Sequence, residues 1–252
     1  MLDIESLTKR FGGLTAVNDV SARFARGTIN AIIGPNGAGK TTFFNLISGA
    51  IRPTSGRILF DGQDVTGLRA DQAARLGMAR TFQTTALFDT ATVLDNLIVG
   101  HRLRTRSTLV DVILGTKRLR DEERICREKA RAALDFVGLA HIESRIAGDI
   151  SQEERKRVAF ALALSTDPTL LLLDEPAGGV NPEETEGLAR LIRKMAQSGL
   201  TVCLIEHKMD MIMNLADRIL VLNYGEKIAE GTPAEIRANP AVIEAYLGSE
   251  HA

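Results

Sequence analysis

The first sixty residues alternate apolar and polar positions in short runs, which are separated by glycine-containing turns. A period of two is typical of strands that bury one face, and the turns at Gly12-Gly13 and Asp61-Gly62 favour hairpins. One run, Thr28 to Ile33, is mostly apolar and leads directly into a glycine-rich turn. The helical pattern of Thr42 to Gly49 follows. We therefore expect an antiparallel sheet, and within the same stretch of sequence a strand, loop and helix in that order.

From about Leu68 to Thr166 the pattern turns helical, which indicates an inserted helical subdomain over residues 84–166. After Asp167-Pro168, short apolar runs alternate with helical patterns, as is typical of a parallel sheet with crossover helices. The helical stretches are Asp71 to Leu76, Val93 to Arg104 and Asp121 to Val137, and the apolar runs are Leu170 to Leu173, Val202 to Ile205 and Ile219 to Leu222. The prediction is a single α/β domain over residues 1–252 that contains the helical subdomain.

The formal net charge of −1 argues against nucleic-acid binding, which needs clustered Lys and Arg to displace counterions from phosphates. The N-terminal residues do not resemble a secretory signal, and the apolar runs are far shorter than the ~18 residues that a spanning helix needs. Cys126 and Cys203 lie far apart in the sequence, so we expect buried free thiols in a reducing compartment. These features predict a cytoplasmic protein whose role at a membrane is peripheral.

One segment matches the phosphate-loop pattern, in which two glycines separated by four residues precede Lys and Thr. Glycines allow backbone N–H groups to turn toward phosphate oxygens, and the following helix N-terminus adds its dipole. Lys40 is expected to reach the β and γ phosphates of ATP, and Thr41 to bind Mg²⁺. The loop comprises Gly34, Pro35, Asn36, Gly37, Ala38, Gly39, Lys40, Thr41 and Thr42. An ordinary glycine-rich turn is the alternative, which the strand before it and the helix after it disfavour.

A second chemical feature is the apolar run Leu170 to Leu173, which ends in Asp174 and Glu175. The carboxyl edge of such a sheet is where ligands collect. Asp174 is expected to hold the Mg²⁺ shell, and Glu175 to orient or deprotonate the water that attacks the γ-phosphate. A strand followed by a solvated acidic loop is the alternative. The phosphate loop in the same chain favours the functional interpretation.

With these motifs in place, the sequence resembles a family, the ATP-binding subunits of ABC transporters, and in particular those of branched-chain amino-acid importers. The resemblance covers nearly the whole chain. It rests on Arg10 to Gly13, the phosphate loop, Arg80-Thr81-Phe82-Gln83, Leu173 to Ala177 with Asn181-Pro182, Glu206-His207, Ala216 to Ile219 and Ile228 to Pro233.

The resemblance implies roles for three further residues. Gln83 would sense the γ-phosphate, touch the metal shell and begin the loop that contacts the membrane subunits. His207 would contact the γ-phosphate and position the attacking water. Phe11 would stack on adenine, although an aromatic side chain is equally typical of a core residue. Without the resemblance, a lone glutamine would be taken as a surface residue and a lone histidine as a structural one.

Family members carry a Leu-Ser-Gly-Gly-Gln type segment that presents a helix N-terminus to the ATP of a partner subunit. Here the corresponding segment is Ile150 to Glu154, in which Ser151 remains but Glu153 and Glu154 place carboxylates beside a polyanion. Ser151 and Glu154 also form a Ser-x-x-Glu capping box, which starts a helix well without any contact to ATP. We therefore hypothesise a heterodimer in which one of the two ATP sites is impaired. The alternative is a weak enzyme whose segment was altered by drift or engineering.

The sequence thus predicts a P-loop NTPase of ABC type, with an antiparallel β subdomain and an inserted helical subdomain. Its partners are expected to be separate transmembrane permease subunits and a second ATP-binding subunit, either a different chain or a copy of this one. A branched-chain amino acid or similar solute is the favoured cargo, although no residue of this chain is expected to touch it. A soluble ABC protein acting on ribosomes, DNA or a protein complex is the rival function, and a single cassette without sustained heptads argues against it. A phosphate-loop kinase would need an acceptor site, for which the sequence gives no support.

Overall fold

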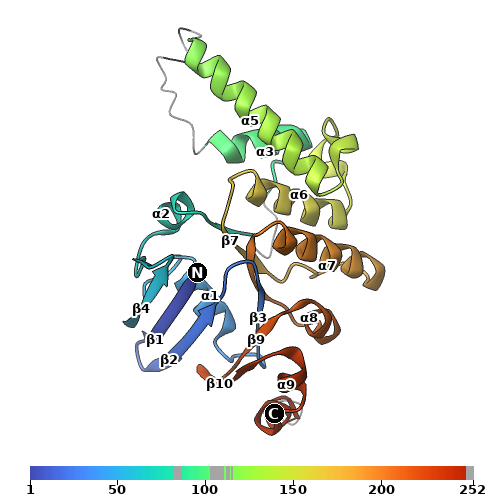
Figure 1. Ribbon diagram of the computed structural model, residues 1–252. Helices are drawn as coiled ribbons and strands as arrows, with labels where there is room; N and C mark the ends of the chain where they lie inside the picture. The colour runs from blue at the N-terminus through green and yellow to red at the C-terminus, as the bar shows by residue number, and fades with distance from the viewer. Residues whose placement is uncertain (82–86, 103–110, 112–113, 115, 248–252) are drawn as a thin grey trace. The chain divides into compact units, whose positions relative to one another are not determined.

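The computed structural model describes residues 1–81, 87–102, 111, 114 and 116–247. The chain divides into two compact units. One, called the core unit below, comprises Met1–Arg80 and Thr169–Ala252, and the other, called the helical unit, comprises Thr81–Pro168. The helical subdomain expected over residues 84–166 lies within the helical unit. Figure 1 shows the helices and strands of the chain, coloured by residue number.

A four-stranded antiparallel sheet in the order β2-β1-β4-β5 opens the core unit. β1 pairs with both neighbours, so that Leu2 lies opposite Phe24 on one side and Phe60 on the other. The turn before β5 has positive φ at Asp61 and Gly62, as the predicted hairpin requires. The strands are β1 (Leu2–Phe11), β2 (Leu14–Phe24), β4 (Ser55–Phe60) and β5 (Gln63–Asp64). The antiparallel sheet expected from the alternating pattern is therefore confirmed.

A six-stranded sheet in the order β10-β9-β3-β8-β7-β6 forms the centre of the core unit. Its strands pair in parallel except β10, which returns antiparallel to β9. Every residue of β3, β7 and β8 is buried, which explains why these strands read as mostly apolar runs. The strands are β3 (Ile29–Ile33), β6 (Met78–Arg80), β7 (Leu170–Asp174), β8 (Thr201–Ile205), β9 (Arg218–Asn223) and β10 (Glu226–Gly231).

One expectation for this region was wrong. The pattern from about Leu68 to Thr166 was expected to be helical, but β6 interrupts it as a three-residue edge strand. A strand this short carries no detectable alternation, and its conformation is fixed by parallel pairing with Leu170–Leu172 of β7. Pairing with a distant segment therefore overrides the local pattern.

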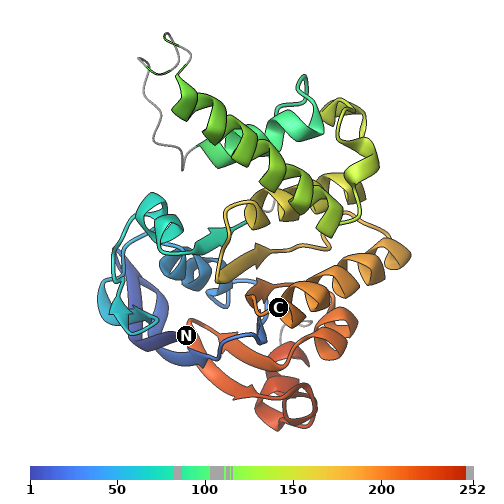
Figure 2. The same cartoon turned by 45° about the horizontal axis from the view of Figure 1, so that its top comes forward.

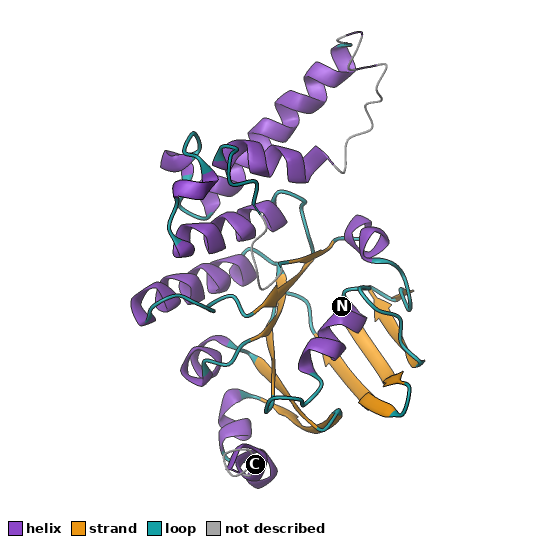
Figure 3. Cartoon of the chain, turned by 180° about the vertical axis from the view of Figure 1, so that it is seen from behind, coloured by secondary structure: helices purple, strands orange, loops and turns teal. Residues whose placement is uncertain are grey.

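Helices of the core unit cover both faces of the six-stranded sheet, and Figure 3 shows α1 between this sheet and the antiparallel one. Phe43 and Phe44 of α1 are fully buried in a cluster that includes residues of both sheets. α7 begins with a capping box formed by Asn181 and Glu184. The helices are α1 (Lys40–Ile47), α2 (Ala70–Arg75), α7 (Pro182–Gln197), α8 (Met209–Leu215), α9 (Pro233–Arg237) and α10 (Pro240–Leu247).

In the described part of the helical unit, α3, α5 and α6 pack against one another (Figures 1 and 2) and bury apolar side chains between them. Leu97, Leu134 and Val158, one from each helix, are fully buried. α3 approaches α6 closely at Gly100, where an added Cβ would lie 2.1 Å from Leu162 Cδ1. The helices are α3 (Val93–Arg102), α5 (Lys117–Phe136) and α6 (Gln152–Leu164), with short 3-10 turns at Ala140–Ile142 and Ala147–Asp149. The expected buried free thiols are confirmed at Cys126, in α5, and at Cys203, in β8.

We predict that Leu172→Ala lowers the free energy of unfolding by about 2–5 kcal/mol, because it leaves a cavity beneath a fully buried strand. The matched control is Leu14→Ala, at a leucine that is 66% exposed, which should change stability by no more than about 0.5 kcal/mol. Urea unfolding followed by circular dichroism measures both. Equal effects of the two substitutions would contradict the assigned core.

Candidate functional site

The phosphate loop joins β3 to α1 and lies against the backbone of two neighbouring strands. A Cβ added at Gly34 would meet the carbonyl oxygen of Leu222, in β9, at 2.0 Å. A Cβ at Gly39 would meet the carbonyl oxygen of Ala16, in β2, at 2.4 Å, and Gly39 has φ +96°. Only glycine fits at these two positions, so the loop is held by close backbone contacts to β9 and β2.

The first turn of α1 is free to receive an anion. Its N-cap is Gly39, and no described side chain caps it. The Lys40 ammonium donates to the carbonyl oxygens of Gly34 and Pro35 at 2.7 and 2.8 Å. Burial lowers the pKa of Lys40 below its usual range, and the negative charge of Glu175 acts in the opposite direction. A desolvated ammonium beside open N–H groups is a strong site for a polyphosphate.

The two predicted acids lie at the carboxyl edge of the central sheet. Asp174 is the last residue of β7 and is buried, whereas Glu175 leaves the strand with a left-handed backbone at φ +47°. The Glu175 N–H donates to the carbonyl of Ile205, in β8, at 2.9 Å. His207 follows β8 and brings its Nε2 within 3.0 Å of Glu175 Oε1. The structure therefore brings together Glu175 and His207, which lie 32 positions apart in the chain.

Glu206 is a buried carboxylate, and the sequence analysis names it only as part of the family resemblance. Its Oε1 accepts hydrogen bonds from the backbone N–H groups of His207 and Lys208 at 2.9 and 3.3 Å. Its Oε2 accepts one from Ala177 at 3.0 Å. The carboxylate thus ties the segment after Glu175 to the segment that carries His207. Its position directly after the apolar run of β8, like that of Asp174 after β7, is the sequence signal that points to it.

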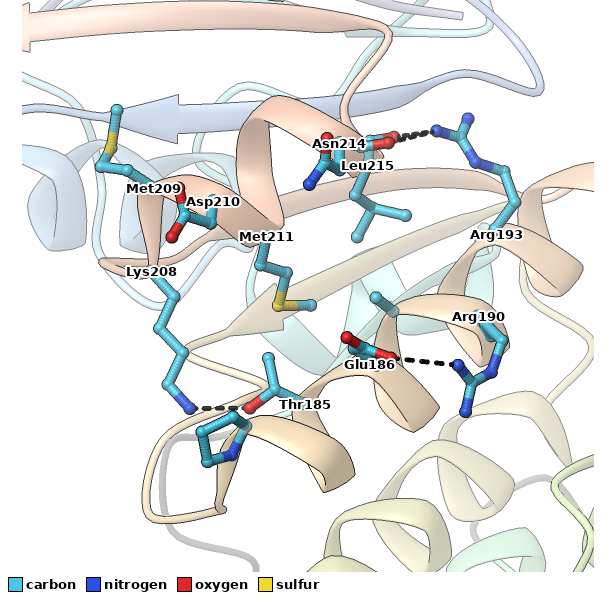
Figure 4. Close-up of a pocket in the computed structure, with 12 residues that line it drawn as sticks. Thr185, Glu186, Arg190, Arg193, Lys208, Met209, Asp210, Met211, Asn214 and Leu215 are labelled. Atoms are coloured by element: carbon cyan, nitrogen blue, oxygen red, sulfur yellow. Dashed lines mark hydrogen bonds and ion pairs between the residues drawn. The ribbon is translucent and has the colours of Figure 1, made fainter.

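Lys208 fastens the same region from the other side. Its ammonium donates to the Val180 carbonyl at 3.0 Å and to Thr185 Oγ1, on α7, at 2.8 Å (Figure 4). Lys208 lies on the rim of a pocket of about 670 Å³ between α7 and α8. None of the predicted site residues lines this pocket. We therefore regard Lys208 as a support of the His207 segment.

Among the described residues, no cluster of three or more His, Cys, Asp or Glu side chains is arranged to hold a metal ion by itself. One buried carboxylate and one hydroxyl near a phosphate loop suit instead a hard cation whose remaining ligands are phosphate oxygens and water. The donors present, Asp174 and Thr41, are oxygen donors of this kind. The residues of the site therefore fit a nucleotide accompanied by Mg²⁺.

The other predicted site residues are Phe11, Gln83 and Ser151. Phe11 is 48% exposed, with the Lys9 ammonium 4.9 Å from its ring centre, so its ring is not a core side chain. Gln83 lies outside the described residues. Ser151 belongs to the helical unit, at the N-cap of α6.

The start of α6 is capped by its own side chains. Ser151 Oγ accepts from the Glu154 N–H at 3.1 Å, and Glu154 Oε2 accepts from the Ser151 N–H at 2.7 Å, which is the predicted capping box. Glu154 also pairs with Arg145, and Glu153 pairs with Arg157. Two carboxylates therefore compensate the positive end of the helix. No such compensation occurs at the first turn of α1, where no acidic residue is present.

Comparison with known proteins decides the family. A profile for the ABC transporter family matches residues 17–178, and a profile described as branched-chain amino acid ATP-binding cassette transporter matches residues 226–252. The chain belongs to the ATP-binding cassette family of ABC transporters. The cassette is accordingly an ATP-binding and ATP-hydrolysing protein, and the predicted fold class is confirmed.

Relatives align with the cassette along nearly its whole length. It is 42% identical to the high-affinity branched-chain amino acid transport ATP-binding protein BraF of Pseudomonas aeruginosa, with 98% of each chain covered. It is 41% identical to the corresponding protein LivG of Escherichia coli K12, again with 98% of each chain covered. A solved ATP-binding cassette of an ABC transporter in its ADP conformation superposes with a TM-score of 0.87 at 33% identity, covering 98% of both chains. In the described part of the cassette, no helix is long and apolar enough to cross a bilayer.

We predict that Glu206→Gln lowers kcat for ATP hydrolysis at least tenfold while ATP affinity stays within about twofold. The amide presents an NH₂ group to backbone N–H donors that now meet a carboxylate, so the His207 segment loses its tether whereas the phosphate loop does not. Phosphate release and equilibrium binding of a fluorescent ATP analogue give the two quantities. The matched control is Glu186→Gln on the exposed face of α7, which should change neither. A parallel loss of affinity and kcat in Glu206→Gln would contradict this role.

Proposed function

We propose that this cassette hydrolyses Mg-ATP to power a membrane importer of branched-chain amino acids or similar solutes. The observation that carries the hydrolytic part is the 3.0 Å contact between Glu175 and His207, at the sheet edge that also bears Asp174. The names of BraF and LivG, and the family profile over residues 226–252, support the choice of cargo. The cassette would act as a peripheral subunit on the cytoplasmic face of the membrane, where separate permease chains select the solute.

Within this proposal, the side chains of the site bind the phosphates, the adenine and the metal. Lys40 and the N–H groups of the loop from Gly34 to Thr42 bind the β and γ phosphates, and Phe11 offers its exposed ring to adenine. Asp174, Thr41 and Gln83 would hold the metal. Mg²⁺, when bound, neutralises charge that develops on the phosphate oxygens.

Two further residues, Glu175 and His207, act on the water that attacks the γ-phosphate. Glu175 orients this water and accepts its proton, because a carboxylate within one water of the γ-phosphate is the base that hydrolysis needs. His207 holds the Glu175 carboxylate through the 3.0 Å contact and contacts the γ-phosphate. The left-handed backbone of Glu175 supports this assignment, since strained residues cluster at functional sites.

Cassettes of this family dimerise and work with membrane permease components. We propose that the partner cassette is a different chain. The reason lies at α6, where Ser151 would have to meet ATP bound to the partner. Its N–H is occupied by Glu154, and the carboxylates of Glu153 and Glu154 would repel the phosphates. A partner with an intact segment would complete the site formed by the phosphate loop of this chain, while the second site would stay impaired.

We predict that Glu175→Gln lowers kcat by a factor of about 10² or more, because general-base catalysis contributes about 10²–10⁴. ATP affinity should stay within a few-fold of the wild type, since the phosphate loop is unchanged. Single-turnover phosphate release and binding of labelled ATP test the two statements separately. Lys40→Ala is the contrasting variant and should lose binding. Wild-type turnover in Glu175→Gln would remove Glu175 from the catalytic role.

We further predict that Glu153→Gly combined with Glu154→Gln raises the ATPase rate of the assembled complex, because it removes both carboxylates from the start of α6. Glu128→Gln, at a glutamate of the same unit that is 63% exposed, is the control for the effect of surface charge. The rate should be measured in the complex with its permease chains, alongside urea unfolding to register the lost capping box. An unchanged rate would contradict the impaired second site.

A further inference from the structure

Arg80 connects the nucleotide-binding helix to the strand that carries Asp174. It is the last residue of β6, and its Nη2 donates to Asp174 Oδ2 at 2.8 Å. Its Nη1 donates to Asn45 Oδ1 at 2.6 Å and to Ser48 Oγ at 2.8 Å, both near the end of α1. The guanidinium carbon lies 5.2 Å from the ring centre of Phe44. One planar cation therefore contacts two elements at fixed geometry.

The pair formed by Arg80 and Asp174 is largely removed from water. The two side chains are 12% and 11% exposed. A carboxylate in such surroundings must be paired with a cation or neutralised, since an isolated buried charge is strongly unfavourable. Arg80 supplies this charge, and its contacts to Asn45 and Ser48 hold it in place. Thr41 lies on α1 and Asp174 lies at the end of β7. Arg80 therefore links the two elements that hold the described residues we assign to the metal.

We propose that Arg80 is the resident counter-cation of Asp174, and that it makes metal binding depend on the nucleotide. This inference rests on the metal role proposed for Asp174. A carboxylate already paired with a guanidinium attracts a divalent ion weakly, so the phosphates of ATP must contribute most of the attraction. Arg80 acts through Asp174 and is a positioning residue.

Neutralising Arg80 has two opposing effects on the affinity for a metal ion. Removing the positive charge of Arg80 removes its repulsion of a divalent ion at Asp174. Even at the dielectric constant of water, the loss of a unit charge several ångströms from the ion raises the binding constant by about tenfold. Losing the hydrogen bond to Asp174 frees the torsions of one short side chain, which weakens binding only a few-fold. The charge effect is larger, so neutralising Arg80 should tighten metal binding.

The experiment is a titration of the full chain with Mn²⁺, in which electron paramagnetic resonance measures the free ion, without nucleotide and with ADP. Without nucleotide, Arg80→Met should bind Mn²⁺ about tenfold more tightly than the wild type. Arg80→Lys keeps the charge and should stay within threefold of the wild type. A tightening of less than threefold in Arg80→Met, or weaker binding, would overturn the proposal.

Two further variants separate the possible failures. Asp174→Asn should weaken Mn²⁺ binding with ADP present, and wild-type binding in this variant would overturn the metal role of Asp174 itself. If Arg80→Met does not fold, the double variant Arg80→Met with Asp174→Asn decides the matter. Restored folding supports the counter-cation role, because the uncompensated charge has been removed. A double variant that also fails to fold would contradict it.

Discussion

The close approach of the phosphate-loop backbone to two neighbouring strands is the constraint on which the rest of this structure depends. Gly34 lies against the Leu222 carbonyl of β9, and Gly39 lies against the Ala16 carbonyl of β2. The turn at Gly225 fastens the same loop, since its N–H donates to the Ala38 carbonyl at 3.1 Å. Backbone atoms have no rotamers with which to adjust, so both sheets must hold their register for the loop to form. The N–H groups that receive phosphate are thereby oriented before ATP arrives, which reduces the cost of ordering on binding.

The charges of the site are carried at the ends of strands whose interiors are buried and mostly apolar. β3, β7 and β8 bury every residue, and the chain leaves them at Gly34, at Asp174 and Glu175, and at Glu206. Burying a carboxylate is unfavourable unless it is hydrogen-bonded, and Glu206 meets this condition with three backbone N–H groups. In each strand, the buried interior therefore supplies stability, and the polar contacts at the carboxyl end set the geometry of the site.

Sequence reasoning succeeded where the cause is local. The buried strands appear as apolar runs, the phosphate loop has its own spacing, and the capping box of Ser151 and Glu154 is contained in four residues. It failed where the cause is a distant partner. β6 is a strand only because β7 pairs with it, and the role of Glu206 depends on Ala177, 29 positions earlier in the chain. Arg80 appeared only as part of a family motif, because nothing in its neighbourhood reveals Asp174, 94 positions later in the chain. The roles of Gln83 in the metal shell and of Phe11 at adenine stay predictions.

The two helix N-termini that the family uses for phosphate differ here in a way that follows from hydrogen-bond counting. An N–H group can donate fully to one acceptor, so a first turn that is capped by its own side chains has less to offer a ligand. α1 begins at a glycine and leaves its first turn to the nucleotide, whereas α6 begins with a serine and a glutamate that satisfy each other. If two copies of this chain formed a dimer, both ATP sites would contain the capped helix and both would be impaired. With a different partner whose segment is open, the phosphate loop of this chain would face a competent helix. The capping box of α6 thus supports the proposal that the partner cassette is a different chain.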